Sequence, residues 1–302
     1  RDLRMSRGLG DVYKRQIFMG MTESPVLIKN YLPTMNRSEI FLVMVSGMGT
    51  IAGSVMGTYI GMLGGTDPAA KVLFATHLLS ASVMAVPGSI VLAKMLCPQT
   101  EEATDHVAIS GKEKENSNIL DAISSGTVTG VKLMTNIAAM LLVFISLVAL
   151  ANYITEGVIG RYTGLNDWIV KITDGKAQGL TFQFILGVIT SPFMWLIGVP
   201  SQDIMLVGSL LGQKTILNEF VAYFQLQQWK DAGLFMYEKS ILMSTYILCG
   251  FANISSIGIL LGGLGVLAPE KRGLISRIGV PAMIGGALVS VLSATIIGMI
   301  LG

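Results

Sequence analysis

Charged side chains are scarce in this sequence. Asp, Glu, Lys and Arg make up only 13% of its 302 residues, whereas an average soluble domain carries about 25%. Hydrophobic residues account for 52%, and the mean hydropathy is +0.64. This balance excludes an ordinary soluble domain and indicates a membrane protein.

Cysteine and histidine are also rare. Cys97 and Cys249 are the only cysteines, and His77 and His106 are the only histidines. Their positions match no metal-binding spacing, and we expect no disulfide. For both histidines we expect ordinary structural roles.

The first 16 residues differ from the rest. They contain five of the basic residues and no apolar central run, which excludes a signal peptide. Without them the chain has 16 basic and 17 acidic residues, so its net charge of +2 does not indicate nucleic-acid binding. Residues 1–16 have two interpretations: a leader that is foreign or mistranslated, and a native cytoplasmic tail. Residues 17–302 are predicted to form the membrane domain.

Long apolar segments define an all-α, polytopic membrane fold. Segments long enough to cross a bilayer occupy residues 40–63, 70–96, 131–154, 240–267 and 280–301. Shorter apolar segments with internal Pro, Gly or Glu occupy 17–31, 181–197 and 204–223, and they predict re-entrant helical hairpins and an adjoining helix. Polar loops are predicted at 98–125 and 157–179.

One pattern occurs twice. Glu23 and Glu219 each lie in a short apolar segment, and each is followed about thirty residues later by a long apolar segment interrupted by small polar residues, at 49–54 and at 250–256. Paired interrupted segments in matching halves point to the binding site of a transporter. The pattern therefore predicts two inverted repeats, each a hairpin followed by a broken helix.

The two glutamates are the strongest candidates for a site, because an ionisable group near the bilayer centre costs about 2.5–3.5 kcal/mol on insertion scales. Each either accepts hydrogen bonds from solute hydroxyls or amides, or serves as a structural helix cap. The neutral candidates around them either line the same cavity or bond to their own helices. They are Thr22, Asn218, Asn253, Ser255 and Ser256.

The first interruption has two interpretations. Free carbonyls and a hydroxyl near Thr50 and Ile51 suit Na⁺, and Gly49 and Gly53 alone could produce a packing kink. Lys214 also interrupts apolar sequence, and it either pairs with a carboxylate or extends to the membrane interface.

Three long motifs resemble the concentrative nucleoside transporters. They are GMTESPVLIKNYLPTMNRSEIFLVMVSGMGTIAGSVMGTYIG from Gly20, GVPSQDIMLVGSLLGQKTILNEFVAYFQL from Gly198 and YILCGFANISSIGILLGGLGVLAPEKR from Tyr246. With the connecting segments, the resemblance covers residues 17–302.

The resemblance implies a homotrimeric Na⁺- or H⁺-coupled nucleoside symporter of the bacterial inner membrane, with a scaffold and a mobile transport domain, and no enzymatic activity. It implies nucleobase contacts at Gly20, Met21, Thr22, Glu23 and Val55, and ribose contacts at Glu219, Asn253 and Ser256, with Phe251 lining the cavity. It implies Na⁺ ligands at Met19, Thr50 and Ile51.

The chain departs from the family pattern at three points. Met21 stands where Gln is common, which leaves the preferred base open, and Gln16 stands where the family has an Asn that binds Na⁺. The family also has helices before the first hairpin, so we expect this 302-residue chain to transport poorly or not at all. The competing interpretations are a nucleoside-permeable pore, a carrier of another small polar solute and an intramembrane enzyme that uses the glutamates as acid and base.

Overall fold

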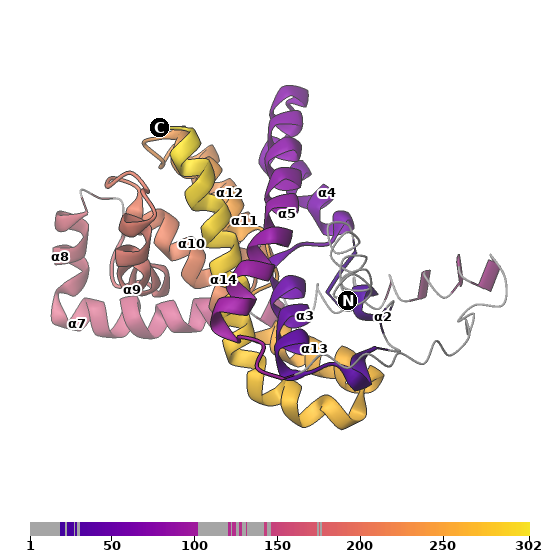
Figure 1. The fold of residues 1–302 in the computed structure, drawn as a ribbon. Coiled ribbons are helices and arrows are strands. Elements are labelled where there is room, and N and C mark those ends of the chain that lie inside the picture. The colour runs from indigo at the N-terminus through magenta and orange to yellow at the C-terminus, as the bar shows by residue number, and fades with distance from the viewer. Residues whose placement is uncertain are drawn as a thin grey trace. The chain divides into compact units, whose positions relative to one another are not determined.

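The computed structural model describes most of the chain as helices. The described residues are 19–21, 23–26, 28, 31–101, 120–121, 123–124, 127–128, 131, 142–143, 146–173, 175 and 177–302. Among them there is no strand, which confirms the all-α prediction (Figure 1). The chain divides into two compact units, one made of residues 1–107 and 185–302 and the other of residues 108–184.

The first broken helix consists of α3 (Arg37–Gly49) and α4 (Gly53–Gly64). Asn36 starts α3 with a capping box, in which its side chain accepts from the Glu39 amide and the Glu39 carboxylate accepts from the Asn36 amide. The helix stops at Gly49, and Thr50 is extended. The interruption lies where the sequence predicts it, within residues 49–54.

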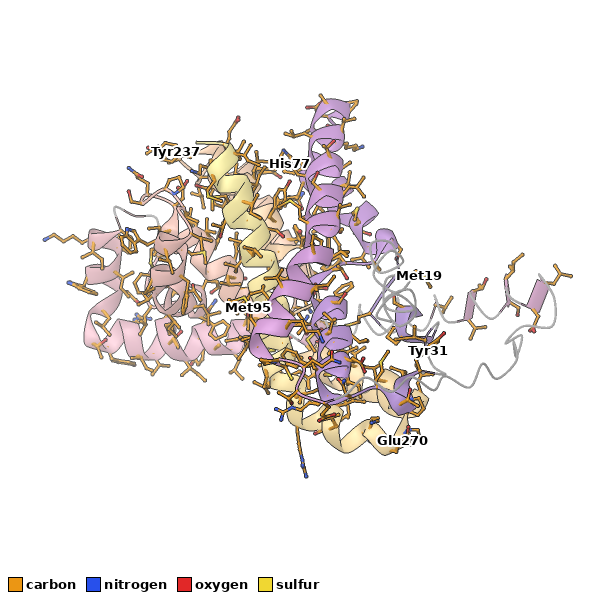
Figure 2. The ribbon with its side chains drawn as sticks, viewed as in Figure 1. Met19, Tyr31, His77, Met95, Tyr237 and Glu270 are labelled. Atoms are coloured by element: carbon orange, nitrogen blue, oxygen red, sulfur yellow. The ribbon has the colours of Figure 1, made fainter. Side chains whose placement is uncertain are left out.

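Two unbroken helices of 29 residues each coincide with the predicted segments 70–96 and 280–301. They are α5 (Pro68–Leu96) and α14 (Arg272–Ile300), and α14 begins a turn or more earlier than predicted, just after η3 (Pro269–Lys271). By length and composition, the ranges Arg37–Gly64, Pro68–Leu96 and Pro269–Ile300 can each cross a membrane. Large apolar side chains remain exposed on α5, such as Met95, as a lipid-facing helix requires (Figure 2).

The second broken helix consists of α12 (Glu238–Leu248) and α13 (Ile254–Leu267). Tyr237, which precedes α12, and Glu270, which follows α13, lie at opposite ends of their unit (Figure 2). The predicted segment 240–267 therefore runs the length of the unit, and its interruption at residues 249–253 agrees with the prediction.

A helical hairpin occupies residues 204–231, in the region where the sequence predicts hairpins and an adjoining helix. Its arms are α10 (Ile204–Ile216) and α11 (Glu219–Asp231), which pack together and meet at Leu217 and Asn218. Asn218 is extended and its side chain caps α11, so the chain reverses just before Glu219. α9 (Phe182–Leu196) precedes the hairpin and matches the predicted segment 181–197. Of the predicted segment 17–31, the structure describes α2 (Glu23–Val26) and parts of its surroundings, with η1 (Leu32–Thr34) after it.

α14 packs against both broken helices at their interruptions. A Cβ added at Gly286 would lie 2.7 Å from the Met48 Cβ and 3.3 Å from the Ala252 Cβ. A Cβ added at Gly49 would lie 3.1 Å from a methyl group of Val289. Because these glycines have no side chain, the two interruptions come together on one helix.

In the unit of residues 108–184, helices occupy most of the region predicted as a loop at 157–179. Residues 146–172 are helical apart from the turn at Gly164, with η2 (Tyr153–Gly160), α7 (Arg161–Thr163) and α8 (Leu165–Ile172), whereas the described residues from 173 to 181 are not helical. Gly164, at φ 71°, makes the turn between α7 and α8. Asn166 then donates to the Glu156 carbonyl and accepts from the Leu180 amide, which stabilises the turn. Half of the predicted segment 131–154 and most of the loop 98–125 lie outside the described residues, and residues 120–124, where described, are helical.

Asp203 anchors the base of the hairpin. Its carboxylate is fully buried and accepts from the amides of Met236 and Tyr237, at 3.0 and 3.1 Å. It therefore joins the start of α10 to the segment before α12.

We expect Asp203→Asn to lower the thermal unfolding temperature of the purified chain in detergent. An amide offers one acceptor oxygen for two amide donors, and a hydrogen bond to a charged group contributes about 1.5–3 kcal/mol. Asp231→Asn is the control, because Asp231 is exposed and pairs with its neighbour Lys230 at 3.0 Å. Equal unfolding temperatures for the two variants would show that the Asp203 anchor contributes nothing.

Candidate functional site

Glu219 lies at the tip of the hairpin, in the first turn of α11, and is 7% exposed. Its Oε2 accepts from the Asn253 Nδ2 at 2.9 Å, and its Oε1 lies 3.4 Å from the Tyr59 hydroxyl, which donates to it. The carboxylate thus connects the hairpin to α4 and to the second helix interruption. The prediction that Glu219 is buried in a hairpin is confirmed.

Asn253 caps α13 and fixes the direction of its own amide. Its Oδ1 accepts from the Ser256 amide at 2.9 Å and from the Ser255 hydroxyl at 2.6 Å. Because Oδ1 is used for the cap, Nδ2 faces Glu219. The Ser256 hydroxyl has two acceptors within reach, the Phe251 carbonyl and Asn253 Oδ1. Its single hydrogen is shared between these two acceptors.

The two interruptions are joined through the main chain. The Phe251 amide donates to the Thr50 carbonyl at 3.3 Å. Gly250, at φ 153°, lies so close to the first interruption that an added Cβ would be 2.9 Å from the Met48 carbonyl oxygen. The structure thus places Phe251 beside Thr50, although these two residues lie about 200 positions apart in the sequence.

The predicted cation ligands are partly described. Thr50 and Ile51 are buried, and the Thr50 hydroxyl donates to the Ser46 carbonyl at 3.1 Å. The Thr50 oxygens keep lone pairs that a cation could use. Met19 is half-buried, and Gln16 lies outside the described residues.

The predicted nucleobase contacts are described less fully. Met21 is buried, and Val55 is half-buried on α4, one turn before Tyr59. The Gly20 carbonyl accepts from the Ser24 amide at 3.2 Å, so it starts the turn into α2. Thr22 and Lys29 lie outside the described residues, as does the side chain of Glu23. The predicted meeting of the two glutamates therefore stays a prediction.

Sequence reasoning missed Tyr59. Its hydroxyl reaches Glu219, and its ring stacks on Tyr223 with 4.1 Å between centroids. Its position one turn after Val55, on the same face of a helix, is the signal that could have identified it.

Among the described side chains, Lys214 meets neither expectation. The side chain is fully buried and does not reach an interface, and its ammonium donates to two neutral oxygens, the Ile247 carbonyl and the Ser290 hydroxyl.

His77 contacts the Tyr246 hydroxyl at 3.1 Å, and Cys97 and Cys249 are free thiols, as predicted. His106 lies outside the described residues.

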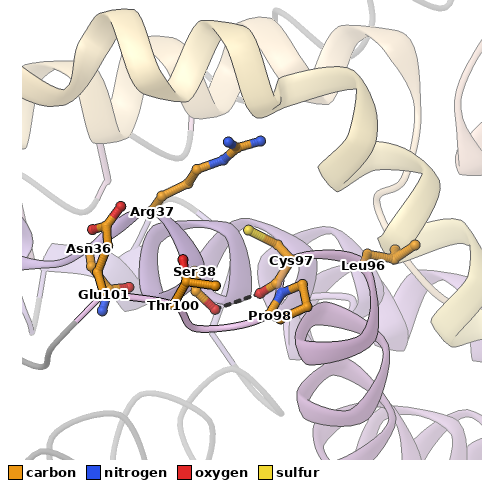
Figure 3. Close-up of a pocket in the computed structure, with 8 residues that line it drawn as sticks. All are labelled: Asn36, Arg37, Ser38, Leu96, Cys97, Pro98, Thr100 and Glu101. Carbon is orange, nitrogen blue, oxygen red and sulfur yellow. Dashed lines mark hydrogen bonds between the residues drawn. The ribbon is translucent and has the colours of Figure 1, made fainter.

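A separate cavity of about 230 Å³ opens where α3 begins and α5 ends (Figure 3). Arg37, Ser38, Cys97 and Glu101 are among its lining residues, and the Ser38 hydroxyl donates to the Cys97 carbonyl at 2.6 Å. None of the predicted site residues lines this cavity, so it is distinct from the candidate site.

Comparison with known proteins decides the family. Residues 77–298 match the family described as "Na+ dependent nucleoside transporter C-terminus". The chain belongs to this family. The match confirms the resemblance seen in the sequence motifs and places the chain in a family of transporters.

Relatives in bacteria and mammals support the assignment. The chain is 39% identical to an uncharacterised transporter of Haemophilus influenzae over 289 residues, which are 95% of this chain and 64% of that protein. It is 38% identical to sodium/nucleoside cotransporter 1 of Rattus norvegicus, covering 94% of this chain and 43% of the relative. It is 37% identical to nucleoside permease NupC of Helicobacter pylori, covering 95% and 63%. The chain therefore spans less than two thirds of the length of these relatives.

Solved structures of CNTnw share the fold. The inward-facing, substrate-bound state matches with a TM-score of 0.80 at 34% identity, over 96% of this chain and 64% of that one. An outward-facing variant matches with a TM-score of 0.81 at 35% identity, over 95% and 64%. The family fold therefore covers nearly the whole of this chain.

Proposed function

We propose that this chain carries the binding machinery of a cation-coupled nucleoside symporter in the bacterial inner membrane. The observation that carries the proposal is the buried Glu219–Asn253 pair, which joins a hairpin tip to a helix interruption. A carboxylate accepts hydrogen bonds only, and an amide both donates and accepts, so the pair suits the hydroxyls of a ribose. Ser256 adds a hydroxyl beside them, and Phe251 borders the same place.

The other half of the site would hold the base. Gly20, Met21, Thr22 and Glu23 at the first hairpin, with Val55 on α4, are the residues proposed to contact it. Met21 offers a thioether instead of an amide, so base selection would rest on packing more than on hydrogen bonding.

The coupling ion is Na⁺ in this proposal, with H⁺ as the alternative. The names of two mammalian relatives, sodium/nucleoside cotransporters 1 and 2 of Rattus norvegicus, support Na⁺. The proposed ligands are the Met19 and Ile51 carbonyls and the oxygens of Thr50. Since Thr50 also accepts from the Phe251 amide, a cation there would order the second interruption as well as the first. Affinities for cation and nucleoside would then rise together.

The transport cycle proposed is alternating access in a homotrimer. The relatives of known structure include inward-facing and outward-facing states. The hairpin, both broken helices and α14 are packed together here and would move as the transport domain.

Equilibrium binding tests the proposal. The purified chain in detergent is titrated with radiolabelled uridine and adenosine, with Na⁺ or choline as the cation. We expect saturable binding that Na⁺ strengthens and recovery of the nucleoside chemically unchanged. Failure of every nucleoside to bind would reject the proposal. Conductance without saturation in planar bilayers would favour the pore, and an altered nucleoside would favour an enzyme.

We expect Thr50→Val to weaken the response to Na⁺. The substitution keeps the shape of the side chain and removes one oxygen ligand, which at about 1.4 kcal/mol corresponds to a tenfold higher Na⁺ concentration for half-maximal stimulation of binding. At saturating Na⁺, nucleoside affinity should recover. Thr58→Val, on the exposed face of the adjoining helix α4, is the control. An unchanged Na⁺ response in Thr50→Val would remove Thr50 from the cation site.

A further inference from the structure

Lys214 lies in the last turn of α10, four residues before Asn218 at the hairpin tip, and is fully buried. Its Nζ donates to the Ile247 carbonyl at 2.7 Å and to the Ser290 hydroxyl at 2.8 Å. Ser290 in turn donates its own hydrogen to the Ala287 carbonyl at 2.8 Å, so a lone pair is left for the lysine. The ammonium thus links the hairpin, α12 and α14.

A buried charge is costly to keep, at several kcal/mol of desolvation, unless its surroundings compensate for it. Here the compensation comes from the end of α12. The last carbonyls of a helix have no partners within the helix and carry a partial negative charge. Ile247 supplies one of them, and the position just after it, Leu248, ends the helix. The lysine is therefore a cation held at the negative end of an interrupted helix.

The hairpin supplies partners to more than one of these carbonyls. The Tyr223 hydroxyl on α11 donates to the Thr245 carbonyl at 2.7 Å, and Lys214 on α10 donates to the Ile247 carbonyl. Both arms of the hairpin therefore hydrogen-bond to the same end of α12. Gly250, Phe251 and Asn253 come shortly after that end, so these hydrogen bonds fix their positions.

In this arrangement, the ammonium of Lys214 is the cation at the second interruption. At the first interruption, the proposed ligands of a free cation are carbonyls and a hydroxyl. At the second, a carbonyl and a hydroxyl already hold the ammonium of Lys214.

We propose that Lys214 is a positioning residue for ribose recognition, because its tethered charge fixes the end of α12 and thereby the Asn253 amide opposite Glu219. The inference rests on the proposed nucleoside-binding function. It assigns the ammonium of Lys214 to the second helix interruption, as the counterpart of the cation proposed at the first.

The test compares Lys214→Met with the matched control Lys239→Met, which lies half-buried at the other end of α12. Dissociation constants are measured for uridine, adenosine and their 3′-deoxy analogues in detergent with saturating Na⁺. For Lys214→Met we expect ribonucleoside affinity to fall about tenfold while affinity for the 3′-deoxy analogues changes little, so that discrimination between them disappears; a tenfold change is 1.4 kcal/mol. The control should keep both affinities within about twofold.

A purely structural role would weaken ribonucleosides and 3′-deoxy analogues equally, so preserved discrimination in Lys214→Met would overturn the inference. Ser290→Ala is the milder second variant. It removes one acceptor and leaves the charge in place, and we expect a partial loss of discrimination, about threefold.

Hydrogen exchange gives a readout that needs no nucleoside. We expect the amides of residues 249–253 to exchange about tenfold faster in Lys214→Met than in Lys239→Met, because their anchor is lost. Equal exchange would refute the positioning role even if nucleosides bind. Faster exchange in a chain that binds no nucleoside would instead count against the proposed function alone.

Discussion

Glu219→Gln should lower the affinity of the chain for ribonucleosides by about 100-fold, which is about 2.7 kcal/mol. The carboxylate is buried at the hairpin tip and is held by Asn253 at 2.9 Å. A hydrogen bond from a sugar hydroxyl to a charged acceptor contributes about 1.5–3 kcal/mol, and the amide of Gln offers one oxygen and no charge. Its NH₂ group would also meet the NH₂ group of Asn253 or the hydroxyl of Tyr59.

The measurement is equilibrium binding of radiolabelled uridine and adenosine, with unfolding temperature recorded in parallel. Glu238→Gln is the matched control, because Glu238 is exposed in the first turn of α12 as Glu219 is buried in the first turn of α11. Equal affinities for Glu219→Gln and the unsubstituted chain would remove Glu219 from the site and the ribose assignment with it.

Gly250→Ala should abolish measurable nucleoside binding and lower the unfolding temperature. Gly250 has φ 153°, a conformation that costs a residue with a side chain about 1–3 kcal/mol. The added Cβ would also lie 2.9 Å from the Met48 carbonyl oxygen and 3.1 Å from the Gly49 carbonyl oxygen. These neighbours are backbone atoms, so relief requires the two interruptions to separate.

Gly258→Ala is the control for that variant. Gly258 is an exposed helical residue of α13 whose added Cβ would meet no atom within 4 Å. Alanine is favoured over glycine in a helix by about 0.5–1 kcal/mol, so this variant should be at least as stable as the unsubstituted chain. If Gly250→Ala behaves like Gly258→Ala, the close approach of the two interruptions is not needed for binding.

The sequence predicts the broken helices well, because their causes are local. Small and polar residues interrupt long apolar segments at 49–54 and 250–256, and α3 and α12 end there. Asn253 and Asn218 are strong helix-capping residues, which explains why α13 and α11 start after them.

Other features depend on contacts between distant segments and could not be predicted. The sequence predicts hairpins and an adjoining helix at 181–197 and 204–223, but which of these segments forms the hairpin depends on the packing of α10 against α11. Tyr59 and Lys214 gain their significance from partners more than 30 positions away. The helices at 153–172 are too short to appear as membrane-length apolar segments, although Leu165, Ile169 and Ile172 recur at helical spacing.

The bond from the Phe251 amide to the Thr50 carbonyl involves no side chain. A joint made only of main-chain atoms survives any exchange of the side chains around it, provided that the backbone keeps its course. In the proposed transporter, exchanges at Met21 and Val55 would therefore change the preferred nucleoside and leave the link between the proposed cation and nucleoside sites in place. A new nucleoside preference would then leave the proposed coupling to the cation unchanged.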